Sequence, residues 1–300
     1  MKDRKANQSV NEIEQQRNRV RFLTALAVLF VLTLVFRIFD YALIAKPEKA
    51  VAEETKEDGT PVSENYTTTA HIVAVGNHIC DARIYEKGVK SWDFSPLYEN
   101  VREKIQSADC AIVALNTPLT SDRQSLSGYP VYRSPAELTT GLINTGFDII
   151  AGAGSHSDDA GSDGIRETLK IWNDSYPYVP VLGIHATKED AESVKIVSVN
   201  GINIAFLNYT YGTNTYSLRS SESFMVDDLQ KSAVTKAVLL AQQQSDCIIM
   251  IIDWGDTDAQ EPNEFQKEWA SYLMTLGVNV IIGTRPMSVQ PYGTIRDKSG

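Results

Sequence analysis

Residues 147–169 read F-D-I-I-A-G-A-G-S-H-S-D-D-A-G-S-D-G-I-R-E-T-L, and this stretch decides the fold. The apolar run 147–151 predicts a buried strand, and the pattern from about Gly164 onward predicts an amphipathic helix. The glycine-rich turn between them carries His156, Asp158, Asp159 and Asp163. A strand, a polar turn and a helix in this order place chemistry at the carboxyl end of a parallel sheet. The turn is therefore either a metal or phosphate site or a solvated loop whose aspartates cap the helix.

Outward from this stretch, short buried strands alternate with helices. This order predicts an α/β architecture with a mixed, largely parallel sheet and flanking helices. The other expected strands are residues 70–77, 110–116, 179–184, 247–252 and 278–282. The other expected helices are residues 96–107, 135–145, 227–244 and 264–276. The segment 194–210 carries an Asn200-Gly201 pair between two alternating runs, which predicts a hairpin and hence one antiparallel pair.

The amino-terminal part predicts a membrane anchor. Residues 1–21 are polar and rich in Lys and Arg, and residues 22–36 are uncharged and apolar. Arg37 can reach the lipid headgroups, so residues 22–45 are predicted to form one transmembrane helix. The alternative is a cleavable signal peptide, but no small-residue cleavage site follows the run closely. Because the basic side comes first, residues 1–21 are predicted to be cytoplasmic, and the linker 46–69 and the folded domain 70–300 extracellular.

Composition excludes several classes of protein. The formal net charge is −10, which argues against nucleic acid as a partner because phosphate binding needs clustered Lys and Arg. The three cysteines, Cys80, Cys110 and Cys247, are dispersed and form no C-x-x-C pair. Neither a disulfide framework nor a zinc ribbon is therefore expected. His185 is interpreted as a surface or packing histidine.

Polar side chains follow five of the predicted strands. They are Asn77, Asn116, the Ser155-His156 pair, Asp253 and the Thr284-Arg285 pair. Because the carboxyl ends of parallel strands share one edge of a sheet, we expect these groups to meet there and to form the site.

The motifs that carry these residues resemble one family. They are G-N-H-I-C (76–80), W-D-F-S-P-L (92–97), A-L-N-T-P-L (114–119), the stretch 146–164, Y-T-Y-G-T-N (209–214), D-W-G (253–255) and G-T-R-P-M-S-V-Q-P (283–291). In this order they are similar to the CapA/PgsA family of capsule (poly-γ-glutamate) synthesis proteins. The resemblance implies a calcineurin-like metallophosphoesterase fold for residues from about 70 to 291. That family usually adds closing strands, so a chain that stops at Gly300 is expected to be either a shortened member or truncated.

The chain departs from the family pattern at the positions that would bind metal. Where the family has an aspartate, a glutamate and several histidines, this chain has Asn77, Asn116, Asp253, Thr284, Arg285 and Met287. Only His156 is retained. A binuclear site needs carboxylates and imidazoles together, and the guanidinium of Arg285 would put a permanent positive charge beside any metal. The resemblance therefore implies a remnant site without metal chemistry, formed by Asn77, Asn116, Ser155, His156, Asp253 and Arg285.

Rearranged ligands are the alternative. The side chains available near the same edge are His78, Asp81, Asp158, Asp253, Asp256 and Asp258, and oxygen-rich clusters can bind Ca²⁺ or Mg²⁺. The metal-ligand candidates are His156, Asp253 and Asp81.

Two functions follow from the resemblance. The first is an accessory or binding protein in cell-surface polymer (capsule, poly-γ-glutamate) synthesis, a pseudoenzyme with no cofactor, whose partners are the membrane and the polymer or its synthesis machinery. The second is a working hydrolase of a phosphoester or an amide, dependent on a divalent metal held by rearranged ligands. A third option, a structural membrane protein without a ligand, leaves the glycine-rich turn unexplained.

Overall fold

The structure is a computed structural model that describes residues 67–87, 91–214 and 218–296. The predicted cytoplasmic segment 1–21, the transmembrane helix 22–45 and nearly all of the linker lie outside these residues. Within the described ranges, no helix combines the length and the apolar character that crossing a bilayer requires.

The first sheet is entirely parallel and contains the strand of the deciding stretch. Its strand order is β1-β2-β5-β6. The strands are β1 (Ile72–His78), β2 (Cys110–Leu115), β5 (Ile149–Ala151) and β6 (Val181–Leu182). All four were predicted, with boundaries that differ by a few residues. Because β2 and β5 are completely buried, they read as continuous apolar runs, the pattern expected of a strand covered on both faces.

The second sheet is mixed and has the order β10-β9-β8-β7. Its strands are β7 (Lys195–Val199), β8 (Ile202–Thr210), β9 (Cys247–Asp253) and β10 (Val280–Gly283). The β7–β8 pair is antiparallel, and the other pairs are parallel. Asn200 and Gly201 both have positive φ (51° and 82°), as a two-residue hairpin turn requires. The predicted hairpin is confirmed.

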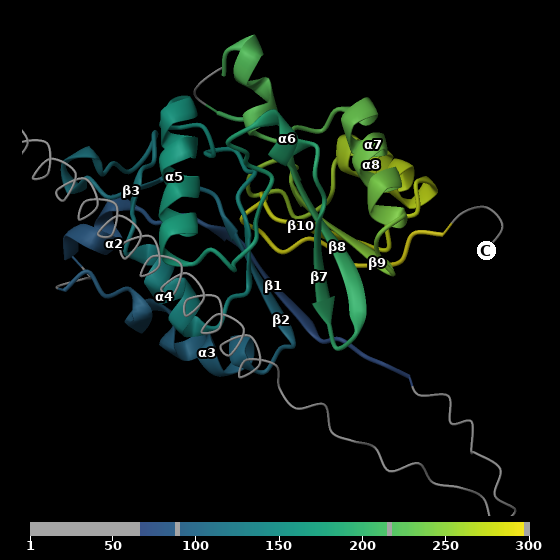
Figure 1. Ribbon diagram of the computed structural model, residues 1–300, viewed down its shortest axis with the longest axis horizontal. Helices are drawn as coiled ribbons and strands as arrows, with labels where there is room; N and C mark the ends of the chain where they lie inside the picture. Colours follow the sequence, from purple (N-terminus) through teal and green to yellow (C-terminus); the bar gives the residue numbers. More distant parts are fainter. Residues whose placement is uncertain (1–66, 88–90, 215–217, 297–300) are drawn as a thin grey trace, which may run out of the picture. The chain divides into compact units, whose positions relative to one another are not determined.

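The two sheets pack face to face, and helices cover their outer faces (Figure 1). Alternate residues of β2 show this. Cys110, Ile112 and Ala114 belong to the core between the sheets, whereas Ala111, Val113 and Leu115 pack under the helices. The first sheet is covered by α3 (Glu99–Gln106), α4 (Leu138–Thr145) and α5 (Gly161–Ser175). The second is covered by α7 (Lys231–Gln242) and α8 (Glu264–Thr275).

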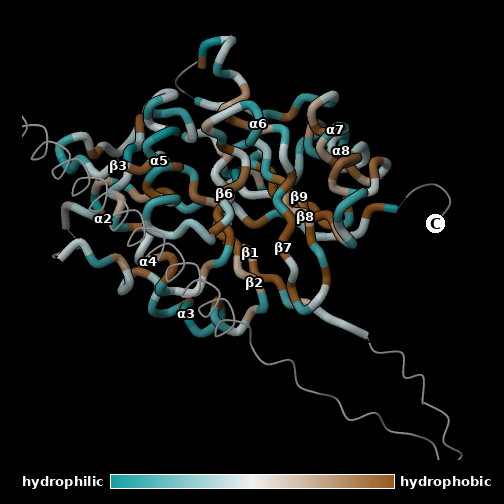
Figure 2. Tube along the Cα trace, viewed as in Figure 1, coloured by the Kyte–Doolittle hydropathy of each residue, from teal (hydrophilic) through white to brown (hydrophobic). Residues whose placement is uncertain are grey.

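The α/β class with largely parallel strands is confirmed, but the strands form two four-stranded sheets instead of one. The reason is that a strand buried on both faces shows no alternation, so the sequence does not reveal which runs are hydrogen-bonded neighbours. Figure 2 shows the apolar strands at the centre of the described domain. The shorter elements are α2 (Ala82–Lys87), η1 (Ser95–Tyr98), β3 (Leu119–Thr120), η2 (Arg123–Ser125), β4 (Ser134–Pro135), α6 (Lys188–Ala191) and η3 (Ser220–Met225).

Candidate functional site

The polar residues that follow the strands of the first sheet meet around Asn116. Its side-chain nitrogen donates to Asn77 Oδ1 (2.9 Å) and Ser155 Oγ (3.0 Å), and its Oδ1 accepts the backbone N–H of His156 (2.8 Å). A Cβ on Gly154 would lie 2.4 Å from that oxygen, so only glycine lets the turn approach Asn116 this closely. Asn77, Asn116, Ser155 and His156 therefore form one hydrogen-bonded group across β1, β2 and β5.

His156 is oriented by a buried carboxylate. Its Nδ1 lies 2.8 Å from Asp159 Oδ2, which also accepts the backbone N–H of Tyr132 (2.7 Å). The Tyr132 ring meets the imidazole edge-on, with 4.7 Å between ring centroids. A carboxylate on one nitrogen fixes the tautomer and turns the other nitrogen toward the site. The contribution of Tyr132 was not predicted, because only the fold brings it to the turn.

The loop that carries His156 is not solvated. Asp158 and Asp159 are 1% and 2% exposed, and helix α5 begins after Ala160 without a side-chain cap. The alternative of a solvated, helix-capping loop is therefore wrong for these two aspartates. Burial raises the pKa of Asp158 to about 6, against the opposing effect of the hydrogen bond from Thr213.

The second sheet contributes a buried ion pair. Asp253, at the end of β9, is 1% exposed, and its Oδ2 accepts from Arg285 Nη1 (3.3 Å) and Thr210 Oγ1 (3.1 Å). Burial raises the pKa of Asp253, while the positive charge of Arg285 acts in the opposite direction. The neighbouring Thr284 turns its hydroxyl to the backbone oxygen of Ile252 and not toward this pair.

Asn214 connects the site residues of the first sheet with those of the second. Its Nδ2 lies 3.2 Å from His156 Nε2, and Arg285 Nη2 donates to its Oδ1 (3.4 Å). Its backbone N–H donates to the carbonyl of Ser155 (2.8 Å). All six residues of the predicted remnant site are thus connected through one network, and Asn214 is the member that the strand-end argument missed. The Y-T-Y-G-T-N motif was the signal that could have indicated it.

Other predicted ligands have partners elsewhere. Asp81 pairs with Arg83 (2.8 Å), and Asp256 accepts from Asn263 (2.9 Å). His78 Nε2 lies 2.7 Å from the phenolic oxygen (Oη) of Tyr98, and burial lowers the pKa of this histidine to about 4. Among the described residues, no three His, Cys, Asp or Glu side chains gather as a metal ion would require. The guanidinium at the strand ends cannot ligate a cation, and the side-chain oxygens of Asn77 and Asn116 already accept hydrogen bonds within the site.

Asn208 holds the start of the turn against the second sheet. Asn208, on the inner face of β8, accepts the backbone N–H of Ala153 (2.6 Å) and donates to the carbonyls of Ala153 and Ile251 (3.2 Å each). It therefore ties the start of the turn to the second sheet.

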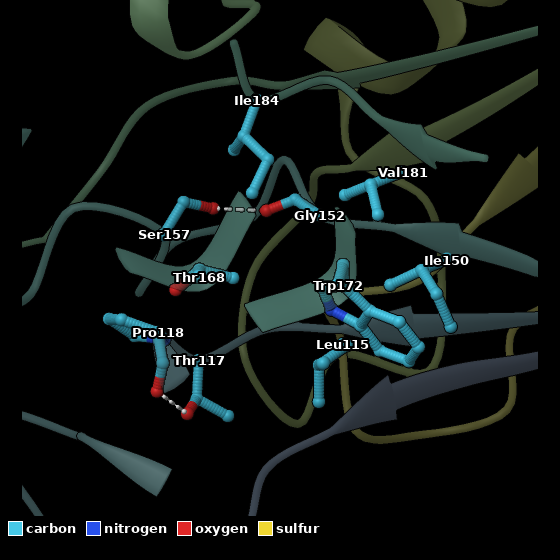
Figure 3. A pocket seen from close by; sticks show the side chains of 10 residues that line it. All are labelled: Leu115, Thr117, Pro118, Ile150, Gly152, Ser157, Thr168, Trp172, Val181 and Ile184. Atoms are coloured by element: carbon cyan, nitrogen blue, oxygen red, sulfur yellow. Dashed lines mark hydrogen bonds between the residues drawn. The ribbon is translucent and has the colours of Figure 1, made fainter. Parts of the chain in front are cut away.

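A cavity of about 10 Å³ lies between β2, β5 and α5, with Thr117, Ser157 and Trp172 among its lining residues (Figure 3). That volume is close to what one water molecule needs, so the cavity is too small for an organic ligand.

A second histidine cluster lies outside this network. His185 is buried and not at the surface, with Nε2 2.9 Å from Asp227 and Nδ1 3.3 Å from Asp190. Burial by itself lowers the pKa of His185, but the two carboxylates outweigh it and raise the pKa to about 9. Lys195 also pairs with Asp190 (2.8 Å). His185 is therefore a buried cation at neutral pH, which the sequence did not indicate.

Comparison with known proteins finds a family model and two relatives that are similar to this chain. The family model described as bacterial capsule synthesis protein PGA_cap matches residues 71–299. The capsule biosynthesis protein CapA of Bacillus anthracis is 21% identical over 160 residues, which are 52% of this chain and 38% of that protein. The PGA biosynthesis protein CapA of Bacillus subtilis (strain 168) is 20% identical over 239 residues, which are 77% of this chain and 61% of that protein. The chain spans less than two thirds of the length of either relative.

Proposed function

The chain belongs to the family of bacterial capsule synthesis proteins, and we propose that it acts outside the cell as a membrane-anchored accessory or binding protein of poly-γ-glutamate synthesis. The observation that carries this proposal is the family match, which includes nearly the whole folded domain and every strand end that contributes to the site. The names of both CapA relatives point to the same process. We also propose that the two-sheet fold is of the metallophosphoesterase type, as the family resemblance implies.

The proposal gives the site a binding role because of its donor set. Asn77 and Asn116 offer neutral amides to each other and to the turn. Arg285 already supplies a positive charge next to Asp253, the one site carboxylate on the second sheet. A divalent cation would have to displace or tolerate that guanidinium, which never loses its charge in proteins. A group of amides, one imidazole and one guanidinium is instead suited to hold a polar polymer by hydrogen bonds.

One observation favours the alternative of a metal-dependent hydrolase. The Asp159–His156 pair, 2.8 Å apart, orients an imidazole nitrogen toward the strand ends, as a general acid or base requires. In such an enzyme the metal would have to be held by ligands other than those that the family pattern provides.

Metal analysis of the purified full-length chain separates these two functions. We expect less than stoichiometric Mn, Zn or Fe, and no change in thermal stability on adding a chelator. The matched variant is the double substitution His156→Ala with Asp253→Ala, which should contain the same amount of metal as the wild type. Stoichiometric metal that disappears in the double variant would refute the metal-free binding role and favour the hydrolase.

The anchor and the orientation are proposed from residues 1–45. The basic segment before the apolar run would keep the amino terminus in the cytoplasm. Protease added to intact cells should therefore release the domain that follows residue 46, and a tag placed before residue 21 should stay protected. Full protection of the domain would contradict the outward orientation.

A further inference from the structure

The side-chain amide of Asn214 lies between the two site groups that belong to different sheets. Its nitrogen faces His156 Nε2 at 3.2 Å, and its oxygen accepts from Arg285 Nη2 at 3.4 Å. Asn214 is exposed, whereas His156 is 8% exposed and the side chain of Arg285 is 13% exposed. A surface side chain therefore covers a more deeply placed pair of polar groups.

The chemistry of the neighbours determines which way this amide points. Asp159 accepts a hydrogen bond at His156 Nδ1, so in the neutral imidazole the proton is on Nδ1 and Nε2 is an acceptor. A guanidinium only donates, so Arg285 must face the amide oxygen. The NH₂ group therefore points to His156 and the carbonyl to Arg285.

His156 and Arg285 thus present one acceptor and one donor, separated by the width of an amide group. A carboxylate in this position would set a second lone pair against Nε2, and an ammonium group would be repelled by Arg285. An amide satisfies both groups at once, as Asn214 does. Neither hydrogen bond is short, so an incoming amide with better geometry can replace this side chain.

Aromatic rings hold the two groups in place. Tyr211 stacks on the Arg285 guanidinium, 4.3 Å from its ring centroid, and Tyr132 packs against His156. Tyr211 is 45% exposed, and Tyr129, beyond Tyr132, is 80% exposed. Both flanks of the pair therefore end in exposed tyrosine rings, against which the planar groups of an extended ligand can pack.

From this arrangement we infer that His156 and Arg285 form an amide-binding site, that Asn214 occupies it in the free protein, and that a backbone amide of an amide-linked polymer displaces Asn214. The inference rests on the proposed function, which supplies poly-γ-glutamate as the polymer. It adds a specific contact, one polymer amide against His156 and Arg285, and a built-in competitor that lowers affinity until it is displaced.

The first experiment measures binding of a fluorescent γ-linked glutamate oligomer to the full-length chain by anisotropy. Asn214→Ala removes the competitor and should tighten binding about tenfold. The reason is that the oligomer no longer has to break the two modest hydrogen bonds that Asn214 makes in the free protein. Asn173→Ala, an exposed asparagine on α5, is the matched control and should bind like the wild type. Unchanged or weaker binding by Asn214→Ala, with wild-type binding intact, would overturn the displacement while leaving the proposed function standing.

A second experiment uses acetamide, which replaces the group that Asn214→Ala deletes. In ¹⁵N-histidine-labelled protein, acetamide should shift the His156 Nε2 resonance of Asn214→Ala and leave that of the wild type and of Asn173→Ala unchanged. Acetate at the same concentration should have no such effect. Equal responses of Asn214→Ala and the wild type would refute the amide site. A specific acetamide response without oligomer binding by any variant would retain the site and refute the polymer, so the two failures are distinguishable.

Discussion

Two buried histidines follow neighbouring strands of the first sheet, and their surroundings differ in one respect. His185, after β6, has both ring nitrogens on carboxylates, Asp227 and Asp190. His156, after β5, has one nitrogen on a carboxylate and the other on the neutral amide of exposed Asn214. His185 is a cation held between two carboxylates, whereas one ring nitrogen of His156 contacts a side chain that a ligand can replace.

The two sites differ in how many of their groups are ionic. The cluster of His185 links the end of β6 to α6 and to residue 227, which lies beside the end of β8 because Thr210 N–H donates to the backbone oxygen of Asp227. Its ionic groups satisfy one another, so no ligand is needed to complete it. The site around His156 is instead built from amides, a hydroxyl and one ion pair, which leaves hydrogen-bonding capacity for a ligand.

The largest expected effect comes from removing the fixed cation. His185→Leu leaves the carboxylates of Asp227 and Asp190 facing an apolar side chain and should lower the free energy of unfolding by about 3 to 4 kcal/mol at pH 7. Chemical denaturation measures this change. Lys195→Met, which removes only the half-exposed partner of Asp190, should cost less than about 1 kcal/mol. Equal losses in the two variants would contradict the structural role assigned to His185.

The same cluster predicts a dependence of stability on pH. The pKa of His185 is raised from 6.5 to about 9 in the folded state, so the folded protein binds this proton more tightly than the unfolded chain. The resulting stabilisation is complete below about pH 6.5 and is lost as the pH rises through 9, for a total of roughly 3 kcal/mol. Unfolding free energies measured from pH 6 to 10 should show this decline in the wild type and a flatter curve in His185→Leu. Parallel curves would mean that His185 is not the group responsible.

A smaller effect is expected at the other histidine. His156→Gln removes one hydrogen bond to Asp159 and one to Asn214, but Asp159 keeps the backbone N–H of Tyr132. The free energy of unfolding should fall by only about 1 kcal/mol, while binding of the γ-linked oligomer should be lost. Stability and binding measured on the same preparation test this separation. A loss of stability as large as that of His185→Leu would remove the distinction between the two sites.

Much of the fold could be predicted from local patterns. The Asn200-Gly201 hairpin and the buried runs of β2, β5 and β9 have signals that lie within a few residues of the chain. The convergence of Asn77, Asn116 and His156 followed from one rule about parallel strands. The roles of Tyr132, Asn208 and Asn214 did not, because each is created by residues more than twenty positions away.

The sequence by itself determined the α/β class, the succession of strands and helices, and the residues at the strand ends, since these depend on side-chain periodicity and on glycine and polar punctuation. Only the tertiary structure decided that the strands form two facing sheets, that Asn214 lies between His156 and Arg285, and that His185 is a buried cation. These features depend on contacts between distant segments. The free energy of a buried charge or amide is set by its partners and by its exposure to water, and only the folded chain determines both.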